Sequence, residues 1–285
     1  MKDHEDTLKH IAEYEDILEN RATMAKVLIK ELQSYKKQYA VPRKTLIDNL
    51  EEAVVEEKKI EEMDVVFLMD RFGYAKLLDM GVYERNKEAA HTDYKYVFIC
   101  KNTDKICIFT NKGQMHLLKV LDLPYGKFRD KGIPIDNLSN YNSSEENFIY
   151  IINLGAIIHS RLLFGTKTAM LKMVDGSEFD VAKRTTAATK LNEDDELLIV
   201  HAMTGEETVV MQSEKEMFLR IEASTIPEKK KGAVGVRGMK LNAGDALSNI
   251  YVLDGESEET VEVKGKEVVL NRLRVGNRDT KGTKR

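Results

Sequence analysis

The residues best suited to chemistry in this sequence are basic and lie beside closely spaced glycines. In the stretch KKKGAVGVRGMKL, residues 229–241, three lysines precede Gly232, Gly235 and Gly238, which recur at intervals of three. Because glycine has no side chain, the backbone there can approach another surface closely, and the flanking cations attract an anion. The pattern predicts a turn-rich loop that enters a strand and faces an anionic partner. A plain β-turn with solvated lysines fits these residues equally well.

Residues for metal, nucleotide or disulfide chemistry are scarce. The six histidines show no ligand spacing, and the chain has no G-x-x-x-x-G-K-[ST] loop for ATP. The only two cysteines, Cys100 and Cys107, are expected to be free thiols in the core of a protein from a reducing compartment. We therefore predict no metal site and no cofactor.

The bulk composition predicts a soluble protein. The chain has 285 residues, of which 42% are hydrophobic and 32% charged, with a net charge of −4. It is long enough for one large or two modest domains. No apolar run reaches the roughly 18 to 20 residues that span a bilayer, and residues 1–19 are too charged for a signal peptide. We expect a cytoplasmic protein without a membrane partner.

The first 50 residues differ in character from the rest. Apolar residues recur there at helical spacing with charges between them, which predicts two helices over about 4–19 and 21–39, the second ended by Pro42. Residues 1–62 contain 11 basic and 15 acidic side chains, whereas the remaining 223 residues contain 33 of each. The acidity of the chain thus belongs to this helical segment.

A charged linker, EEAVVEEKKIEE at residues 51–62, is expected to separate the helical segment, 1–50, from a β-rich body, 63–285. Beyond it the apolar pattern alternates every two residues, as in strands. Five stretches read as strand, tight turn, strand: residues 65–78, 106–119, 161–174, 207–221 and 259–273.

These five stretches form a repeat. Their expected turn positions are Gly73, Gly113, Thr168, Lys215 and Gly265, separated by 40, 55, 47 and 50 residues. A lone hairpin buries only part of its apolar surface, so each copy should pack against its neighbours. Radial packing of four-stranded units leaves only short edges exposed, which favours a propeller-like architecture.

Three stretches carry a resemblance to one family. GVRGMKL, with its basic loop before it and the turn 242–245 after it, resembles a blade junction in the C-terminal domain of the A subunit of bacterial type IIA topoisomerases, DNA gyrase and topoisomerase IV. FTNKG at 109–113 with LLKVLDLP at 117–124 resembles a blade of that domain. AEYEDILENRATMAKVLIKELQSYKKQYAVPRKTLID resembles the end of the family's coiled-coil arm, where it leads into this domain. The resemblance covers about residues 8–285.

The resemblance implies a fold and a function. The fold is mainly β, a propeller-like β-pinwheel of about five four-stranded blades, in which neighbouring blades exchange a strand, preceded by a short α-helical segment. The function is sequence-independent binding and bending of double-stranded DNA around the rim, which guides the transport segment during ATP-dependent changes of DNA topology. The implied partners are DNA, the ATPase B subunit of the enzyme, and the rest of its A subunit, in the bacterial cytoplasm at the nucleoid.

In this family basic residues between blades hold the DNA by neutralising phosphates. From Lys264 to the C-terminus eight basic residues face two acidic ones. The positions that correspond to inter-blade segments here are Lys127, Arg129, Lys131, Lys183, Arg184, Lys229, Lys230, Lys231, Arg237, Lys240, Arg272, Arg274, Arg278 and Lys281.

The sequence departs from the family in two respects. The A subunits of gyrases carry Q-R-R-G-G-K-G after the first blade's hairpin, whereas this chain has GVYERNKEAAHTDYKYV at 81–97. Together with five apparent units instead of six, this favours a topoisomerase IV-like protein or a diverged gyrase. None of the eleven tyrosines follows an arginine, as the strand-cleaving tyrosine would. The chain is therefore expected to belong to an ATP-hydrolysing isomerase but to be inactive alone. A propeller-like protein-interaction scaffold is the alternative function.

Overall fold

The chain consists of two compact units, Met1–Lys58 and Lys59–Arg285. The computed structural model describes residues 2–42, 44–45, 61–255 and 257–285. Most of the predicted linker, 51–62, lies outside the described residues, so the predicted boundaries at 50 and 62 remain predictions.

The first unit contains the two helices expected from the apolar periodicity. They are α1 (Lys2–Glu19) and α2 (Arg21–Tyr39), and neither contains a buried residue. Asn20 separates them, and its side chain accepts a hydrogen bond from the Ala22 amide at 3.0 Å. This N-cap satisfies a donor that the first turn of α2 leaves without a partner, which explains the break at this position.

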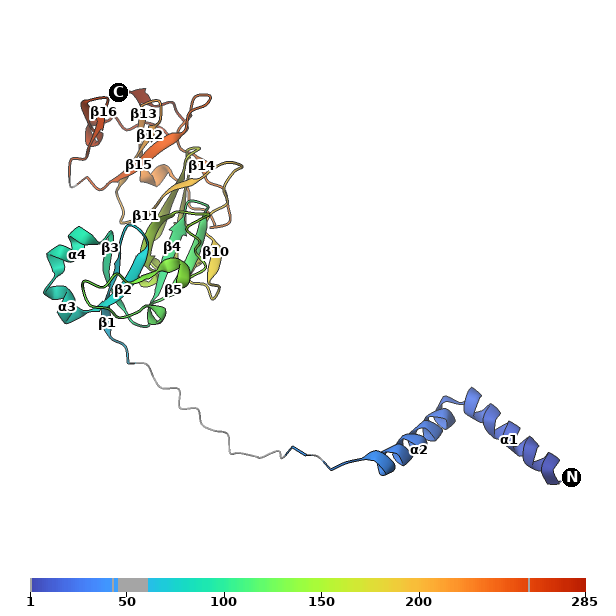
Figure 1. Cartoon of the computed structure of the whole chain (residues 1–285). Helices are drawn as coiled ribbons and strands as arrows, with labels where there is room; N and C mark the ends of the chain where they lie inside the picture. The colour runs from blue at the N-terminus through green and yellow to red at the C-terminus, as the bar shows by residue number, and fades with distance from the viewer. Residues whose placement is uncertain (1, 43, 46–60, 256) are drawn as a thin grey trace. The chain divides into compact units, whose positions relative to one another are not determined.

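Five antiparallel hairpins are the repeated element of the second unit, as the sequence repeat predicts. They follow one another along the chain from β1 to β17, and Figure 1 shows this progression in the colours from cyan to red. The hairpins are β1 (Asp64–Met69) with β2 (Tyr74–Asp79), β4 (Lys105–Thr110) with β5 (Gln114–Lys119), β8 (Arg161–Thr166) with β9 (Met170–Asp175), β12 (Thr208–Ser213) with β13 (Met217–Glu222), and β16 (Thr260–Val263) with β17 (Lys266–Val269).

Each of the first four hairpins gains two further strands and becomes a four-stranded blade. The third strand pairs with the first strand of the hairpin, whereas a short outer strand pairs with the second. The third strands are β3 (Tyr96–Lys101), β7 (Phe148–Asn153), β11 (Leu197–Met203) and β15 (Leu247–Leu253). The outer strands are β6 (Ile133–Pro134), β10 (Thr185–Ala187), β14 (Val236–Arg237) and β18 (Thr283–Lys284).

Every outer strand comes from the segment that follows the next hairpin in the sequence. For example, β14 follows the fourth hairpin but pairs with β9 of the third blade, where Val236 lies opposite Leu171. This exchange links successive blades covalently and confirms the pinwheel fold. The prediction of about five four-stranded blades needs one correction: in the described residues, β16 and β17 form a sheet of two strands only.

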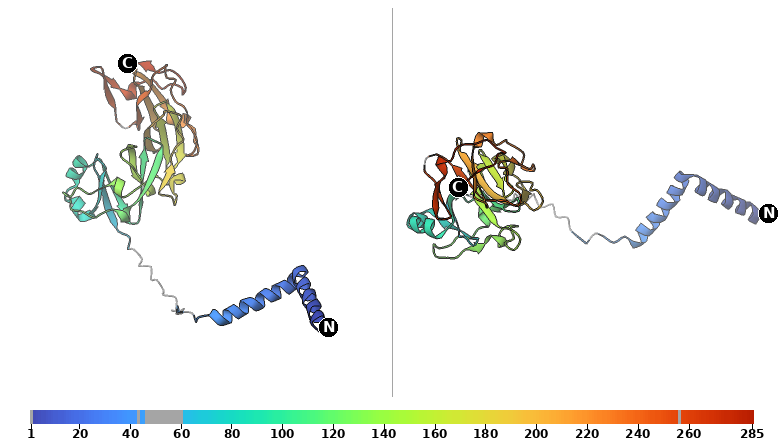
Figure 2. Two further views of the ribbon diagram at one scale, coloured as in Figure 1. Left: turned by 45° about the vertical axis from the view of Figure 1, so that its right-hand side comes forward. Right: turned by 90° about the horizontal axis from the view of Figure 1, so that it is seen from above.

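The blades of the second unit follow one another in space (Figure 2), and apolar cores lie between successive blades. Phe67 of blade 1 packs with Ile108 of blade 2, and further clusters join blades 2 and 3, 3 and 4, and 4 and 5. Both cysteines are buried, free thiols, Cys100 on β3 and Cys107 on β4. The hairpin strands of blades 1 to 4 each face an apolar cluster on both sides, so most of their central residues are buried and apolar.

Two helices follow the first hairpin, and the sequence pattern did not predict them. They are α3 (Met80–Glu84) and α4 (Lys87–Asp93). Tyr83 and Ala90 from these helices are buried against Val66 and Leu68, on the face of blade 1 that is turned away from blade 2. The equivalent segments of the next hairpins instead supply outer strands to a preceding blade. The second unit is therefore mainly β, with a helical cover on its first blade.

The hairpin turns differ in sequence among the copies of the repeat, and their backbone angles show how each turn is made. Gly73 and Gly113 have φ of 86° and 71°, as the predicted turn glycines require. In the next two copies the positive φ falls on Ala169 (62°) and Glu216 (63°), one residue after the predicted positions. In the third copy, a neighbouring loop supports the turn, because the Asp195 carboxylate accepts from the amide of Thr168 at 3.0 Å.

Candidate nucleic-acid interface

Four segments lead from a hairpin to the outer strand of the preceding blade. Each follows a short 3-10 turn: η1 (Val120–Asp122), η3 (Gly176–Phe179), η4 (Ala223–Thr225) or η5 (Leu270–Arg272). We call them connectors 1 to 4, residues 123–132, 180–184, 226–235 and 273–282. They contain eleven of the predicted DNA-binding residues: Lys127, Arg129, Lys131, Lys183, Arg184, Lys229, Lys230, Lys231, Arg274, Arg278 and Lys281.

The other three predicted residues lie beside the connectors. Arg237 is on β14, Lys240 follows it, and Arg272 is in η5. Of the whole predicted set, Lys229, Lys231 and Arg278 are intermediate in exposure and the others are exposed. The recurrence noted in the sequence therefore corresponds to one structural position, repeated from blade to blade.

The structure brings the third and fourth basic clusters together. Arg278 donates through Nη1 to the carbonyl oxygen of Arg237 at 3.0 Å, and Arg237 forms a 3.4 Å ion pair with Asp279. The amide of Lys240 donates to the carbonyl oxygen of Thr280 at 3.0 Å. Residues 237–240 and 278–281, about 40 positions apart in the sequence, thus form one basic surface.

Glycines allow the connectors to cross the preceding hairpin at close range. A Cβ on Gly235 would lie 2.5 Å from the carbonyl oxygen of Leu171, and one on Gly132 would lie 2.5 Å from that of Ala75. A Cβ on Gly238 would be 2.6 Å from the Leu171 side chain, whereas one on Gly232 would meet nothing within 4 Å. Two of the three glycines of this series thus pack closely against the chain's own third hairpin. An approach of this loop to an anionic partner stays a prediction.

Connectors 1 and 3 are each folded around a buried lysine. Lys76 on β2 is 1% exposed, and its Nζ donates to the carbonyl oxygens of Lys127, Phe128 and Asp130 at 3.1, 2.5 and 2.5 Å. At the equivalent position on β9, Lys172 is also 1% exposed and donates to three carbonyl oxygens of connector 3. The distance from Lys172 Nζ to the carbonyl oxygen is 3.2 Å for Lys230, 2.7 Å for Lys231 and 2.9 Å for Ala233.

Sequence reasoning missed both lysines, although a signal was present. Each stands alone among apolar residues in the middle of a strand, in YAKLLD and MLKMVD. A lone charge in a buried strand requires several polar partners. Burial lowers the pKa of Lys172 from 10.5 to about 8, and it also lowers the pKa of Lys76. The carbonyl contacts act against this effect, because they favour the protonated amine.

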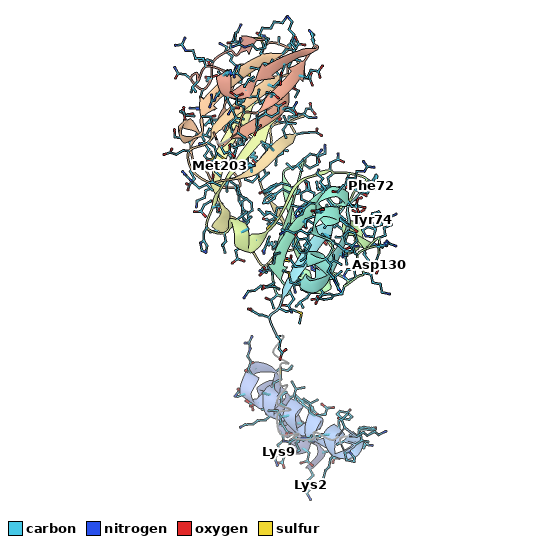
Figure 3. All side chains as sticks on the ribbon, turned by 90° about the vertical axis from the view of Figure 1, so that its left-hand side faces the viewer. Lys2, Lys9, Phe72, Tyr74, Asp130 and Met203 are labelled. Atoms are coloured by element: carbon cyan, nitrogen blue, oxygen red, sulfur yellow. The ribbon has the colours of Figure 1, made fainter. Side chains whose placement is uncertain are left out.

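Connector 1 is also held by contacts of its own side chains. The Asp130 carboxylate accepts from the amide of Lys127 at 2.7 Å, and the Lys131 ammonium lies 4.1 Å from the centre of the Tyr74 ring. Tyr74 and Asp130 lie on the same side of blade 1, together with the exposed Phe72 (Figure 3). The connector is thus a structured loop, on which Lys127 and Arg129 are exposed to solvent.

Connectors 2 and 4 are supported differently. At connector 2 the equivalent side chain is His116, at the middle of β5. Its Nδ1 lies 3.1 Å from Oγ1 of Thr185, the first residue after the connector, and its Nε2 lies 2.8 Å from Glu146 Oε1. At connector 4, Arg220 on β13 donates to the carbonyl oxygens of Asn271 and Leu273 at 2.5 and 3.4 Å. A basic side chain that donates to the backbone near the connector is therefore present at three of the four connectors.

Acidic side chains neutralise part of the basic surface. Glu178 lies 3.5 Å from Lys230 Nζ, and Arg272 pairs with Glu258 at 3.2 Å. In both of these ion pairs the basic side chain is exposed to solvent, and such ion pairs add little stability. Each cation can therefore exchange its carboxylate partner for a phosphate. In the described part of the chain, nine of the predicted residues form no ion pair and no cation–π contact: Lys127, Arg129, Lys183, Arg184, Lys229, Lys240, Arg274, Arg278 and Lys281.

The pattern of blades agrees with one known family. Residues 160–202 and 207–254 match the family described as DNA gyrase C-terminal domain, beta-propeller. The first matched stretch contains β8 to β11 and the second β12 to β15, so each is one full repeat of hairpin, connector, outer strand and third strand.

Longer relatives match almost the entire chain. The DNA gyrase A protein of Staphylococcus epidermidis is 29% identical over 302 residues, which cover 99% of this chain and 34% of that protein. Its counterpart in Lawsonia intracellularis is 29% identical over 293 residues, 95% of this chain and 35% of the relative. The resemblance to the C-terminal region of the A subunits of type IIA topoisomerases is confirmed. The chain spans about a third of the length of these curated relatives.

Solved C-terminal domains of this family share the fold. The domain of a DNA topoisomerase IV superposes with a TM-score of 0.70 at 21% identity, covering 79% of this chain and 73% of that one. The E. coli ParC C-terminal domain gives a TM-score of 0.62 at 16% identity, covering 78% of this chain and 94% of that one. A gyrase A C-terminal domain gives 0.53 at 17% identity, covering 78% of this chain and 76% of that one. These likenesses show a common fold.

Two further findings concern other kinds of site. The described helices include none long and apolar enough to cross a membrane. Within the described ranges, no three His, Cys, Asp or Glu side chains are grouped so that they could hold a metal ion.

Proposed function

We propose that the second unit binds double-stranded DNA along its connectors and bends it without reading its sequence. The observation that carries this proposal is the recurrence of exposed lysines and arginines at one structural position in four successive repeats. A duplex in contact with several connectors would follow the series of blades, and its phosphates would meet a cation at each one. Phosphate contacts of this kind fix position and depend steeply on salt, but they carry no direct sequence information.

Within a type IIA topoisomerase, this domain would guide the transport DNA segment. The rest of the A subunit would cleave DNA, and the ATPase B subunit would drive strand passage. This chain contributes no catalytic group to that scheme, and no cofactor. The two helices at the site of the gyrase heptapeptide, α3 and α4, favour a topoisomerase IV-like or diverged gyrase role.

The test is binding to a duplex of about 40 base pairs over a series of salt concentrations. A variant with Lys229, Lys230, Lys231 and Arg237 changed to Ala should bind more weakly and with a shallower salt dependence, because each lost phosphate contact removes about one released counterion. Fluorescence energy transfer between the duplex ends reports bending in the same samples.

A charge-matched control distinguishes the loss of the connector cations from the loss of net positive charge. It carries Ala at four exposed lysines away from the connectors, Lys87, Lys112, Lys215 and Lys266. This control should retain most of the wild-type affinity. Equal losses in both variants would mean that binding follows net charge alone. If the wild type fails to bind at low salt, the protein-interaction scaffold becomes the better explanation of the fold, consistent with the balance of 33 basic and 33 acidic residues beyond residue 62.

A further inference from the structure

The two buried lysines hold their connectors in the same way, residue by residue. Lys76 binds the carbonyl oxygens of residues 127, 128 and 130, and Lys172 binds those of residues 230, 231 and 233. In both connectors the third of these residues also donates its amide to the carbonyl of the first, at 3.0 Å. The spacing and the turn are therefore identical, although the side chains of the two connectors differ.

This arrangement fixes the direction of the backbone dipoles. In a trans peptide the N–H of the next residue points opposite to the carbonyl. With the carbonyls of 128 and 130 turned toward Lys76, the amides of Arg129 and Lys131 point away from the ammonium. In connector 3 the same holds for Gly232 and Val234. Within the described chain none of these four amides has a hydrogen-bond partner, so each connector offers two outward donors to an anion.

We propose that Lys76 and Lys172 are positioning residues for phosphate binding: each orients one connector so that amide groups and basic side chains together face the DNA backbone. This inference rests on the proposed DNA binding and assigns a role to residues that themselves do not reach the surface. The charged groups around Lys172 are Glu178, Lys230 and Lys231, and only Glu178 is acidic. The carbonyl oxygens therefore supply most of the compensation for the buried charge.

The chain itself shows which substitution should preserve the role. Arg220 supports connector 4 by donating its guanidinium to two carbonyl oxygens. Lys172→Arg should therefore keep connector 3 ordered, whereas Lys172→Met keeps a long, unbranched side chain and removes all three donors. Lys112→Met is the matched control, because it removes one lysine charge at an exposed hairpin tip away from the connectors.

The experiment measures DNA affinity at fixed salt, together with amide exchange without DNA at Lys231 and Ala233, whose amides donate to Glu178 and to the carbonyl oxygen of Lys230. Lys172→Met should remain folded, exchange these amides faster and bind DNA roughly three- to tenfold more weakly, the effect of about one net hydrogen bond. Lys172→Arg should restore most of the affinity and slow the exchange, and Lys112→Met should behave like the wild type.

Other outcomes would contradict the positioning role of the lysines, the proposed DNA binding, or both. If the wild type binds and Lys172→Met binds equally well, the positioning role is wrong while the proposed DNA binding stands. The same conclusion follows if the arginine variant is as weak as the methionine variant despite normal folding. If the wild type does not bind DNA at all, both the proposed function and this inference fail. Lys76→Met, tested in parallel, must show the same change at connector 1.

Discussion

Gly235 lies so close to Leu171 that a Cβ on the glycine would come within 2.5 Å of the leucine carbonyl oxygen. The contact marks the point where connector 3 crosses from the fourth hairpin onto the third blade. Gly132 and Gly282 make the corresponding close approaches, to Ala75 and Phe218. Strand exchange between blades therefore depends on a residue without a side chain at each of these crossings.

Replacement of Gly235 by alanine should destabilise the domain. The new methyl group would press on backbone rather than on a flexible side chain, so we expect a loss of about 1 to 3 kcal/mol in the free energy of unfolding. Urea unfolding followed by circular dichroism measures it. Gly232→Ala is the control three residues away, where a Cβ meets nothing within 4 Å. Similar stabilities of the two variants would contradict the close crossing.

The helices α3 and α4 should be required for the stability of blade 1 in particular. Ala90 is fully buried against this blade, so Ala90→Asp places a charge in an apolar core and should cost several kcal/mol locally. Hydrogen exchange should then accelerate in β1 and β2 far more than in β12 and β13, because repeats couple mainly to their neighbours. Ala89→Asp, at an exposed position, serves as control. Uniform acceleration in all blades would argue against such a local role.

Both cysteines should resist alkylation in the folded protein. Burial raises the pKa of the Cys100 and Cys107 thiols to about 12, so almost no thiolate exists at pH 8. Mass spectrometry after iodoacetamide treatment should find no adduct on the native chain and two on the urea-unfolded chain. Rapid modification of either thiol in the native state would show that the blade interfaces open.

The stability of the domain should depend on pH through Lys172. Its pKa is about 8 in the folded protein, below the ordinary 10.5. Between these values the unfolded chain binds more protons than the folded one, so the free energy of unfolding rises with pH from about 8 to 10.5. Below pH 8 both states are protonated, and the cost of burying the charge is constant. Wild type should therefore gain stability relative to Lys172→Met across this window in urea titrations, whereas parallel profiles would disprove the shift.

The sequence by itself determined the repeated elements. Alternation every two residues and the turn residues predicted all five hairpins, because strand pairing across a tight turn is a local interaction. The helices α1 and α2 and the break at Asn20 followed from helical periodicity in the same way. Basic residues at matching points of each repeat also located the connectors, since position within a repeat can be read without knowing the fold.

Only the tertiary structure decided which segments meet. That β14 pairs with β9, that Arg278 reaches Arg237, and that Lys172 lies beneath connector 3 are contacts between residues about 40 to 65 positions apart. No local pattern encodes such pairings, because they result from stacking of the blades. The segment 80–93 is the clearest case: no local pattern predicted its helices, which are stabilised by burial on blade 1. Long-range packing, more than local propensity, therefore sets the surface that would face DNA.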